Sequence, residues 1–399
     1  MSKTLKDIPS PKSWPLVGCL PHYYQQGFDK RHLILNEFAR EYGSIFVENL
    51  AFLKNAIVND IQEYSKIVKA DGQQVDRIPL DPLLHYRRSK GLSDGIVNGI
   101  GPKWYESRQL VNKKMLSKSF ADAFIEQLHD VAIDFCQKLE NDKQDTDLIF
   151  DLEFFIDKWA VDSSFIFLFG KRLDCLKGDD IEFVRNLQSV FDILHQLLFS
   201  IPLYKIWPTS TWREFERRCD KLFQSALELC QQNQVESETS TSPSLMNYLL
   251  LDKNLSKQVA VELTVEMLMG AVEAEIKNAD YRNINNITYL KAIVKETLRL
   301  YPVTYSTSRI LNKDTECGGY ELPRGTHVQA NLYTMGRNED RFRNAKEFIP
   351  ERWLGDEGKN NLVFCNWIFG HGPRLCLGKR LAEEEVYLAI FEVNLSRVI

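Results

Sequence analysis

The stretch Phe369-Gly-His-Gly-Pro-Arg-Leu-Cys-Leu-Gly378 decides how this chain is interpreted. Its cysteine, Cys376, lies in a glycine-rich loop directly before a long amphipathic run. The first turn of a helix has N–H groups without an intrahelical partner and carries the positive end of the dipole, so it favours a thiolate. The glycines let the backbone approach a flat, bulky ligand, and Arg374 can meet an anionic group on that ligand.

A thiolate, a close backbone approach and an anion-binding arginine together favour haem held by sulfur. Two other interpretations stay open for the loop alone. A glycine-rich segment before a helix is also typical of a phosphate-binding loop. A cysteine at the start of a helix can equally be a reactive thiol.

The full pattern, Phe-x-x-Gly-x-Arg-x-Cys-x-Gly, is more specific than its parts and resembles the haem-binding signature of the cytochrome P450 monooxygenases. The likeness extends from Pro9 to the helix after Cys376. It implies a mainly α fold with small β-sheets and haem b as the cofactor. Cys376 would be the axial thiolate ligand, with Phe369 packed near the sulfur.

The composition agrees with one large domain. The chain has 399 residues, of which 44% are hydrophobic, enough for a substantial core. We expect a single domain over 1–399, with a proline-rich lead-in at 1–20 and a polar loop at 234–244. A net charge of −5 gives no reason to expect nucleic acid as a partner. Scattered cysteines indicate a reducing compartment, and no apolar run is long enough for a transmembrane helix.

Four residues are candidates for holding the haem propionates. Trp104 and Arg108 are spaced to share one helix face, and both can donate hydrogen bonds to a carboxylate. By themselves they are better explained as a core tryptophan beside a solvated arginine. The family's haem-contacting helix has the same Trp-x-x-x-Arg spacing, so the resemblance implies propionate binding by both, together with Arg374. It also implies this role for Arg309, although an exposed edge-strand charge is nearly as good an explanation.

A group of three charged residues corresponds to a structural network of the family. Glu296 and Arg299 are three residues apart on a predicted helix that ends before Pro302. Arg352 lies in the segment Pro350-Glu-Arg-Trp353. The resemblance implies that these charges support the haem region as scaffold and take no part in catalysis.

A basic helix stripe is the candidate docking surface for an electron donor. Lys291, Lys295 and Arg299 recur every fourth residue, and a basic face attracts acidic partners. A solvated helix face is the alternative interpretation. Lys291 and Lys295 match positions where mitochondrial members of the family bind a small ferredoxin. The resemblance therefore implies a mitochondrial, peripheral inner-membrane protein, with the endoplasmic reticulum or the cytoplasm as alternatives.

An apolar stripe at helical spacing runs from Phe183 to Leu198 and is followed by the apolar stretch Phe199–Trp207. We expect this stripe to face the core or a pocket. Peripheral membrane contact is the minority interpretation. Short apolar runs at Ile45–Val47 and Ala56–Val58 predict strands, although their alternation is weak.

The chain departs from the family pattern in two places. Glu273 matches the acidic residue of the helix on the oxygen side of the haem, but Ala274 stands where the family has a threonine that helps deliver protons. Only 23 positions separate Glu273 from Glu296, too few for a full-length crossing helix and its connections. We therefore expect a missing block here.

We also expect the family's C-terminal strands to be missing after a last amphipathic helix. The apolar positions of this helix are Leu377, Leu381, Leu388, Phe391 and Leu395.

These features predict a haem-thiolate monooxygenase that hydroxylates an apolar, sterol-like or xenobiotic substrate with dioxygen and ferredoxin-delivered electrons. Glu273 is the candidate proton-relay residue. The alternative is a non-catalytic or poorly folded haem-binding remnant, produced by a truncated gene model or a splice form. A third possibility is a haem-free thiol or phosphate-binding protein.

Overall fold

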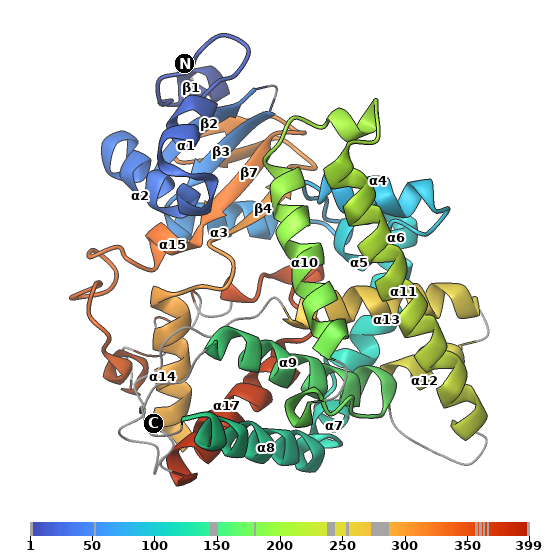
Figure 1. Cartoon of the computed structure of the whole chain (residues 1–399). Coiled ribbons are helices and arrows are strands. Elements are labelled where there is room, and N and C mark those ends of the chain that lie inside the picture. The colour runs from blue at the N-terminus through green and yellow to red at the C-terminus, as the bar shows by residue number, and fades with distance from the viewer. Residues whose placement is uncertain are drawn as a thin grey trace. The chain divides into compact units, whose positions relative to one another are not determined.

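The computed structural model describes residues 3–51, 53–143, 151–178, 181–237, 244–252, 255–272, 287–355, 358, 361, 364 and 367–396 (Figure 1). Its contacts group into two compact units. Unit 1 comprises residues 1–78, 100–105 and 276–376, and unit 2 comprises 79–99, 106–275 and 377–399. The described part is mainly helical with small sheets, which confirms the predicted fold class.

Unit 1 holds all the described strands. Its elements are β1 (Lys3–Thr4), η1 (Leu5–Asp7), α1 (Leu20–Gln26), η2 (Phe28–Lys30), α2 (Arg31–Tyr42), β2 (Ile45–Leu50), β3 (Leu53–Val58), α3 (Ile61–Ala70), the first turn of α6 (Gly101–Met115), α14 (Ile287–Leu300), β4 (Ser306–Ile310), β5 (Thr315–Cys317), β6 (Tyr320–Leu322), β7 (His327–Asn331), α15 (Leu332–Met335), η6 (Pro350–Trp353) and η7 (Gly372–Arg374).

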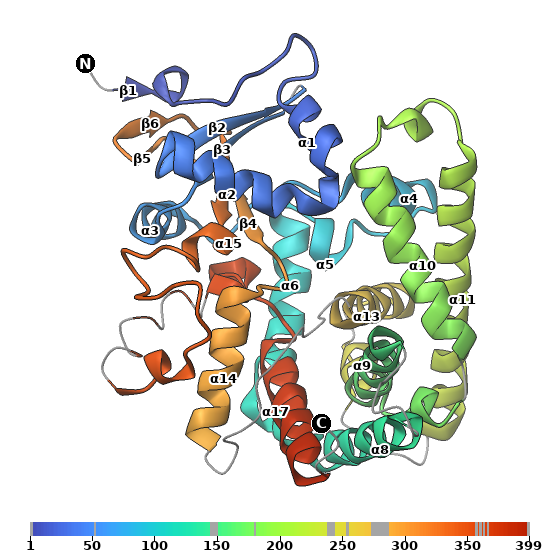
Figure 2. The same cartoon turned by 60° about the vertical axis from the view of Figure 1, so that its left-hand side comes forward.

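The larger sheet of unit 1 has the strand order β2-β3-β7-β4, and α2 packs against β2 (Figure 2). β2 and β3 form an antiparallel pair in which Ile45 lies opposite Val58, and β7 pairs parallel with β3 and antiparallel with β4. Both strands predicted from the sequence are confirmed. Their alternation is weak because the consecutive residues Ile45, Phe46 and Val47 are all buried. A smaller sheet has the order β1-β6-β5.

Unit 2 is helical throughout its described part. It contains α4 (Asp81–Ser89), α5 (Gly95–Asn98), the rest of α6, α7 (Lys118–Asp122), α8 (Ile125–Lys143), α9 (Leu152–Phe169), η4 (Cys175–Lys177), α10 (Ile181–Leu198), η5 (Leu203–Lys205), α11 (Ser210–Ser237), α12 (Leu245–Leu250), α13 (Lys257–Val272) and α17 (Lys379–Ser396).

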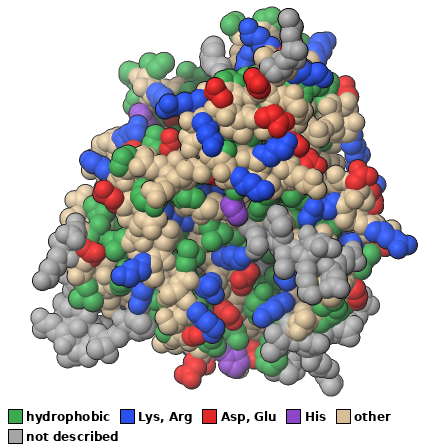
Figure 3. Space-filling model, turned by 180° about the vertical axis from the view of Figure 1, so that it is seen from behind, with side chains coloured by type: hydrophobic (Ala, Val, Ile, Leu, Met, Phe, Trp, Pro, Cys, Tyr) green, Lys and Arg blue, Asp and Glu red, His purple; other side chains and the backbone are tan. Residues whose placement is uncertain are grey.

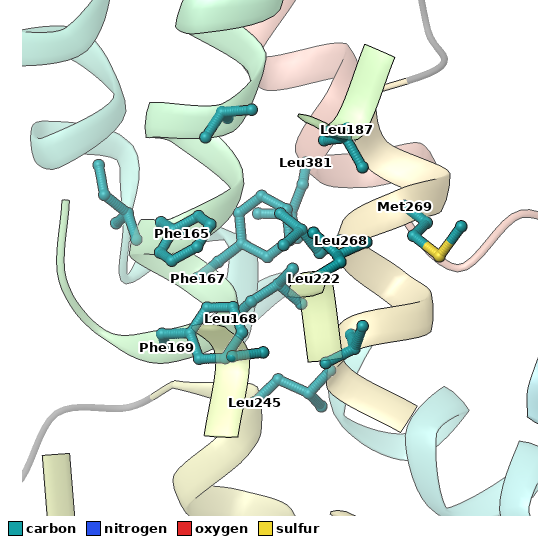
Figure 4. Close-up of a cluster of buried hydrophobic side chains, with 14 of the residues drawn as sticks. Phe165, Phe167, Leu168, Phe169, Leu187, Leu222, Leu245, Leu268, Met269 and Leu381 are labelled. Carbon is teal, nitrogen blue, oxygen red and sulfur yellow. The ribbon is translucent and has the colours of Figure 1, made fainter. Parts of the chain in front are cut away.

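The core of unit 2 gathers around α9, which is buried along almost its whole length. Figure 4 shows Phe165, Phe167, Leu168 and Phe169 of this helix packed with apolar side chains from α10, α11, α12, α13 and α17. A helix with apolar residues on most of its sides favours such a buried position, and α9 also buries the charged residues Asp157, Lys158 and Asp162. The apolar stripe on α10 also faces this core, since its buried residues are Val184, Leu187, Val190, Leu194 and Leu197. This confirms the expectation that the stripe faces the core.

Two expectations about helices need correction. α11 continues to Ser237, so the polar loop predicted at 234–244 begins later than expected. Once a helix is formed, each added residue gains a backbone hydrogen bond, so the helix extends into the polar segment. Leu377, two residues before the last helix, and Leu381 within it are buried as predicted. Phe391 of the same helix is 42% exposed and does not belong to the apolar face. The predicted continuation of α13 into Glu273 and Ala274 lies outside the described residues.

The described surface carries mixed charge. On the face shown in Figure 3, Lys and Arg side chains are interspersed with Asp and Glu. Within the described part of the chain, no helix is both long and apolar enough to cross a bilayer.

Candidate functional site

The loop before α17 holds Cys376 at the surface. The Cys376 N–H donates to the Phe369 carbonyl at 2.6 Å, which closes the loop over η7. Gly370 has φ +77°, and a Cβ there would lie 3.1 Å from the Arg374 carbonyl, so the closure requires glycine. Among the described cysteines Cys376 alone is exposed. α17 begins at Lys379, which confirms that the cysteine lies just before a helix.

Arg374 and Trp104, predicted separately, lie against each other. The Arg374 guanidinium carbon is 3.5 Å from the centre of the Trp104 ring, and both side chains are buried. Arg374 Nε donates to the Val75 carbonyl at 2.8 Å. Stacking and hydrogen bonding together hold the charge in one orientation. The sequence contains no signal for this contact, because 270 positions separate the two residues.

Arg309 connects β4 to the cysteine loop. β4 is an edge strand of the larger sheet, but Arg309 is only 1% exposed, so its interpretation as an exposed charge is wrong. Its Nε donates to Asp71 Oδ2 at 2.9 Å, and its Nη2 donates to the His371 carbonyl at 2.9 Å. Burial raises the pKa of the Asp71 carboxyl, against the lowering influence of Arg309. Sequence reasoning missed Asp71, which lies directly after α3 and 238 positions from Arg309.

Arg108, the remaining propionate candidate, is buried on α6 one turn after Trp104. The interpretation of Arg108 as a solvated arginine is therefore wrong. Its contacts place it in unit 2, whereas Trp104, Arg309, Phe369, Arg374 and Cys376 all belong to unit 1.

The predicted charge network around Glu296 is present and fully buried. The Glu296 carboxylate accepts hydrogen bonds from Arg299 (2.7 and 2.8 Å), from Arg352 Nε (3.0 Å) and from the Ile349 N–H (2.8 Å). It also accepts one from Trp353 Nε1 at 2.9 Å, a partner that the sequence analysis missed. Burial by itself raises the pKa of Glu296, but the hydrogen bonds and positive charge of Arg299 reverse this and lower it.

Arg299 therefore does not belong to the predicted basic stripe on α14. Its guanidinium is 0% exposed because Glu296 and three backbone carbonyls bind it inside unit 1. Lys291 is exposed and Lys295 is half-buried, so the basic surface of this helix is limited to these two lysines.

The donor set around the loop suits a haem with two propionates. One exposed sulfur, two buried guanidinium groups and an indole N–H come from one unit. A Cβ at Gly372, in the middle of the loop, would meet no atom within 4 Å, so the loop leaves open space there. Among the described residues Arg309 donates to Ser308, Asp71 and His371, so these partners use three of its five N–H groups.

Comparison with known proteins agrees with this arrangement. The sequence profile of the family described as Cytochrome P450 matches residues 8–276 and 271–393. The chain belongs to the cytochrome P450 family. As such it is an oxidoreductase, a monooxygenase whose cofactor is haem b with a cysteine thiolate as the axial ligand.

Individual relatives confirm the likeness to the mitochondrial branch of the P450 family. Cytochrome P450 10 of Lymnaea stagnalis is 33% identical over 97% of this chain and 79% of its own length. The mitochondrial cytochrome P450 11B2 of Mesocricetus auratus is 30% identical over 92% of this chain and 81% of its own length. The mitochondrial 1,25-dihydroxyvitamin D(3) 24-hydroxylase of Mus musculus is 26% identical over 98% of this chain and 83% of its own length.

The lengths of these P450 alignments show that relatives contain residues that this chain lacks, as the expected missing block requires. The alignment with the Lymnaea protein runs over 431 positions, more than the 399 residues of this chain, so that relative has residues at positions where the chain has none. The two matches to the family profile overlap at residues 271–276, a range that includes Glu273.

Proposed function

We propose that this chain is a mitochondrial-type haem-thiolate monooxygenase with Cys376 as its axial ligand. The observation that carries the proposal is the exposed Cys376 in a loop held by the Phe369 carbonyl, with a buried arginine from β4 bonded to the same loop at His371. When bound, the haem supplies the activation of dioxygen.

Each residue of the chain has a separate role in this proposal. Trp104, Arg108 and Arg374 bind and orient the propionates, and Arg309 contributes its remaining N–H groups while it holds the loop through His371. Phe369 packs beside the sulfur. Glu273 is the proposed proton-relay residue on the oxygen side of the haem, beyond the described end of α13.

The spectrum of the reduced, carbon monoxide-bound protein tests the proposal. Thiolate ligation gives a strongly red-shifted Soret band, which we expect in the wild type and not in Cys376→Ala. Cys376→His is the matched control because it keeps an iron ligand without a thiolate. A wild-type spectrum identical to that of Cys376→His contradicts the assignment.

The substrate we propose is an apolar, sterol-like or xenobiotic molecule, and the electron donor is an acidic ferredoxin. The names of the relatives support the substrate class, since one of them is a vitamin D hydroxylase. The exposed Lys291 and the half-buried Lys295, one turn apart on α14, offer the positive charge that such a donor requires.

We also propose peripheral attachment to the inner mitochondrial membrane through the connection between α10 and α11 of unit 2. Its apolar side chains are unusually exposed, with Ile201 at 72%, Leu203 at 53%, Ile206 at 86% and Trp207 at 70%. Large exposed apolar patches mark interaction sites, and tryptophan favours the bilayer interface. The mitochondrial names of the relatives support this location.

A second candidate function is that of a haem-binding remnant without turnover. Ala274 at the position of the family's threonine favours it, as do the additional residues of the relatives. Product formation with ferredoxin and its reductase supports the monooxygenase, whereas tight haem binding without product supports the remnant.

A further inference from the structure

Three cations from different helices of unit 2 surround two phenylalanine rings. Lys158 Nζ on α9 lies 4.6 Å from the centre of the Phe154 ring and 5.3 Å from that of Phe155. Lys138 Nζ on α8 lies 5.8 Å from the Phe155 centre, and the Arg185 guanidinium on α10 lies 5.6 Å from the Phe154 centre. Lys138 and Arg185 each share a ring with Lys158, and the like charges of both act on the Lys158 ammonium group.

Lys158 lies at the centre of this group and is only 6% exposed. Within the described ranges, Lys138, Lys158 and Arg185 form no ion pair, and the Lys158 ammonium has no hydrogen-bond acceptor. The negative charge of Asp151 attracts Lys158 and opposes the lowering of its pKa. The Asp151 carboxylate, however, caps α9 by accepting a hydrogen bond from the Phe154 N–H at 3.4 Å. Burial and the charge of Lys138 lower the pKa of Lys158.

The rings of Phe154 and Phe155 do not neutralise the positive charges of the three cations around them. A cation over a phenyl face gains a modest attraction, but it keeps its full charge and all its N–H donors. A buried ammonium group is stable when an anion accepts its hydrogen bonds. The described side chains around the Lys158 ammonium group therefore supply no anion whose oxygens accept its hydrogen bonds.

We propose that Lys138, Lys158 and Arg185 form an oxyanion site for a phosphate group. A phosphate carries more than one negative charge at neutral pH and has several acceptor oxygens, so it can bind an ammonium group and a guanidinium group at the same time. The group can belong to free inorganic phosphate or to an anionic phospholipid headgroup. The site is independent of the haem assignment, because none of its residues belongs to the cysteine loop.

Residues 144–150 of the chain are the competing occupant. They lie outside the described residues and include Asp145 and Asp147. If these carboxylates supply the counter-charge, the wild type will not respond to phosphate, but the double variant Asp145→Asn, Asp147→Asn will. That result overturns the proposal.

The test measures binding of inorganic phosphate to the full-length protein by titration calorimetry and by the thermal midpoint, with chloride holding the ionic strength constant. We expect saturable binding to the wild type, and about tenfold or greater weakening in Lys158→Met. Arg185→Gln changes an exposed residue, so it keeps the proposal testable if Lys158→Met fails to fold. Lys118→Gln is the matched control, since Lys118 is a paired lysine of α7 in the same unit.

Two further measurements complete the test. Co-sedimentation with vesicles of phosphatidylcholine, with and without phosphatidylglycerol, compares wild type with Arg185→Gln. Arg185-dependent binding to the anionic vesicles assigns the site to a lipid headgroup, whereas calorimetric binding alone assigns it to free phosphate. Phosphate binding that is absent, or equal in wild type and both variants, overturns the proposal. The Soret band stays unchanged in every arm, so failure here is separate from failure of the haem assignment.

Discussion

Gly95 leaves the room that the carboxylate of Glu266 occupies. A Cβ at Gly95 would lie 2.2 Å from Glu266 Oε2. From this position Glu266 on α13 accepts hydrogen bonds from the backbone N–H groups of Ile96 (2.6 Å) and Val97 (2.9 Å). One turn earlier, Glu262 accepts hydrogen bonds from the Ser93 N–H (2.9 Å) and its hydroxyl (2.6 Å). Two buried carboxylates thus hold the segment 93–97 against α13.

Gly95→Ala is expected to lower the free energy of unfolding by about 2–4 kcal/mol, because the new methyl group displaces Glu266 from two backbone donors. Gly91→Ala is the matched control. Gly91 also has a positive φ (+67°), but a Cβ there meets no atom within 4 Å, so this variant should lose only about 1–2 kcal/mol. Denaturant unfolding of both variants measures the difference, and equal losses would contradict the role of Glu266.

Arg374→Lys is expected to weaken haem retention about tenfold. Lysine keeps the charge but loses the planar group that stacks on Trp104 and binds Val75. The rate of haem transfer to a scavenger protein measures the effect. Trp104→Phe keeps a ring under the guanidinium and should retain haem better than Trp104→Ala. Transfer at the wild-type rate in Arg374→Lys would show that the orientation of this arginine is unimportant.

Glu296→Ala is expected to cost about 3–5 kcal/mol of stability, since it leaves Arg299 and Arg352 buried without their carboxylate. The depressed pKa of Glu296 also predicts a pH dependence. Its contribution is complete above the ordinary value of 4.5 and disappears as the pH falls through the lower value of the folded state. The thermal midpoint of the wild type should therefore fall more steeply below pH 4.5 than that of Glu296→Gln. Parallel curves would rule this out.

The double variant Lys291→Glu, Lys295→Glu is expected to raise the ferredoxin KM about tenfold or more at low salt, with less change in kcat. Added salt should reduce the difference between wild type and variant, because it screens exposed charges. Lys313→Glu changes an exposed lysine elsewhere in unit 1 and serves as the control. An equal KM for both variants would place the docking surface elsewhere.

Ile206→Ser combined with Trp207→Ser is expected to reduce the fraction bound to neutral lipid vesicles severalfold, because burial of these side chains drives attachment. Leu251→Ser is the control, since Leu251 is 81% exposed but lies in the turn after α12. Flotation with vesicles measures both. If both variants lose binding equally, the connection between α10 and α11 is not a specific contact.

Local signals in the sequence predicted the elements that local forces determine. The glycine-rich loop with Cys376 was predicted to lie directly before a helix, and α17 begins three residues after the cysteine, at Lys379. The 3.6-residue spacing of apolar residues located α10, and Pro302 marked the end of α14. The same local reasoning erred at Arg299, where a repeat of basic residues resembled a surface stripe although the guanidinium is buried.

The amino-acid sequence by itself determined the helix-rich class, the cysteine loop and the likeness to the P450 family, because each depends on residues close together along the chain. Only the tertiary structure decided which charges meet: Asp71 with Arg309, Arg374 with Trp104, and Glu266 with the backbone beside Gly95. These partners lie far apart in sequence, and the charge of a side chain does not specify its partner. The partners are determined by the tertiary fold, because a buried polar group without a hydrogen bond destabilises the folded state.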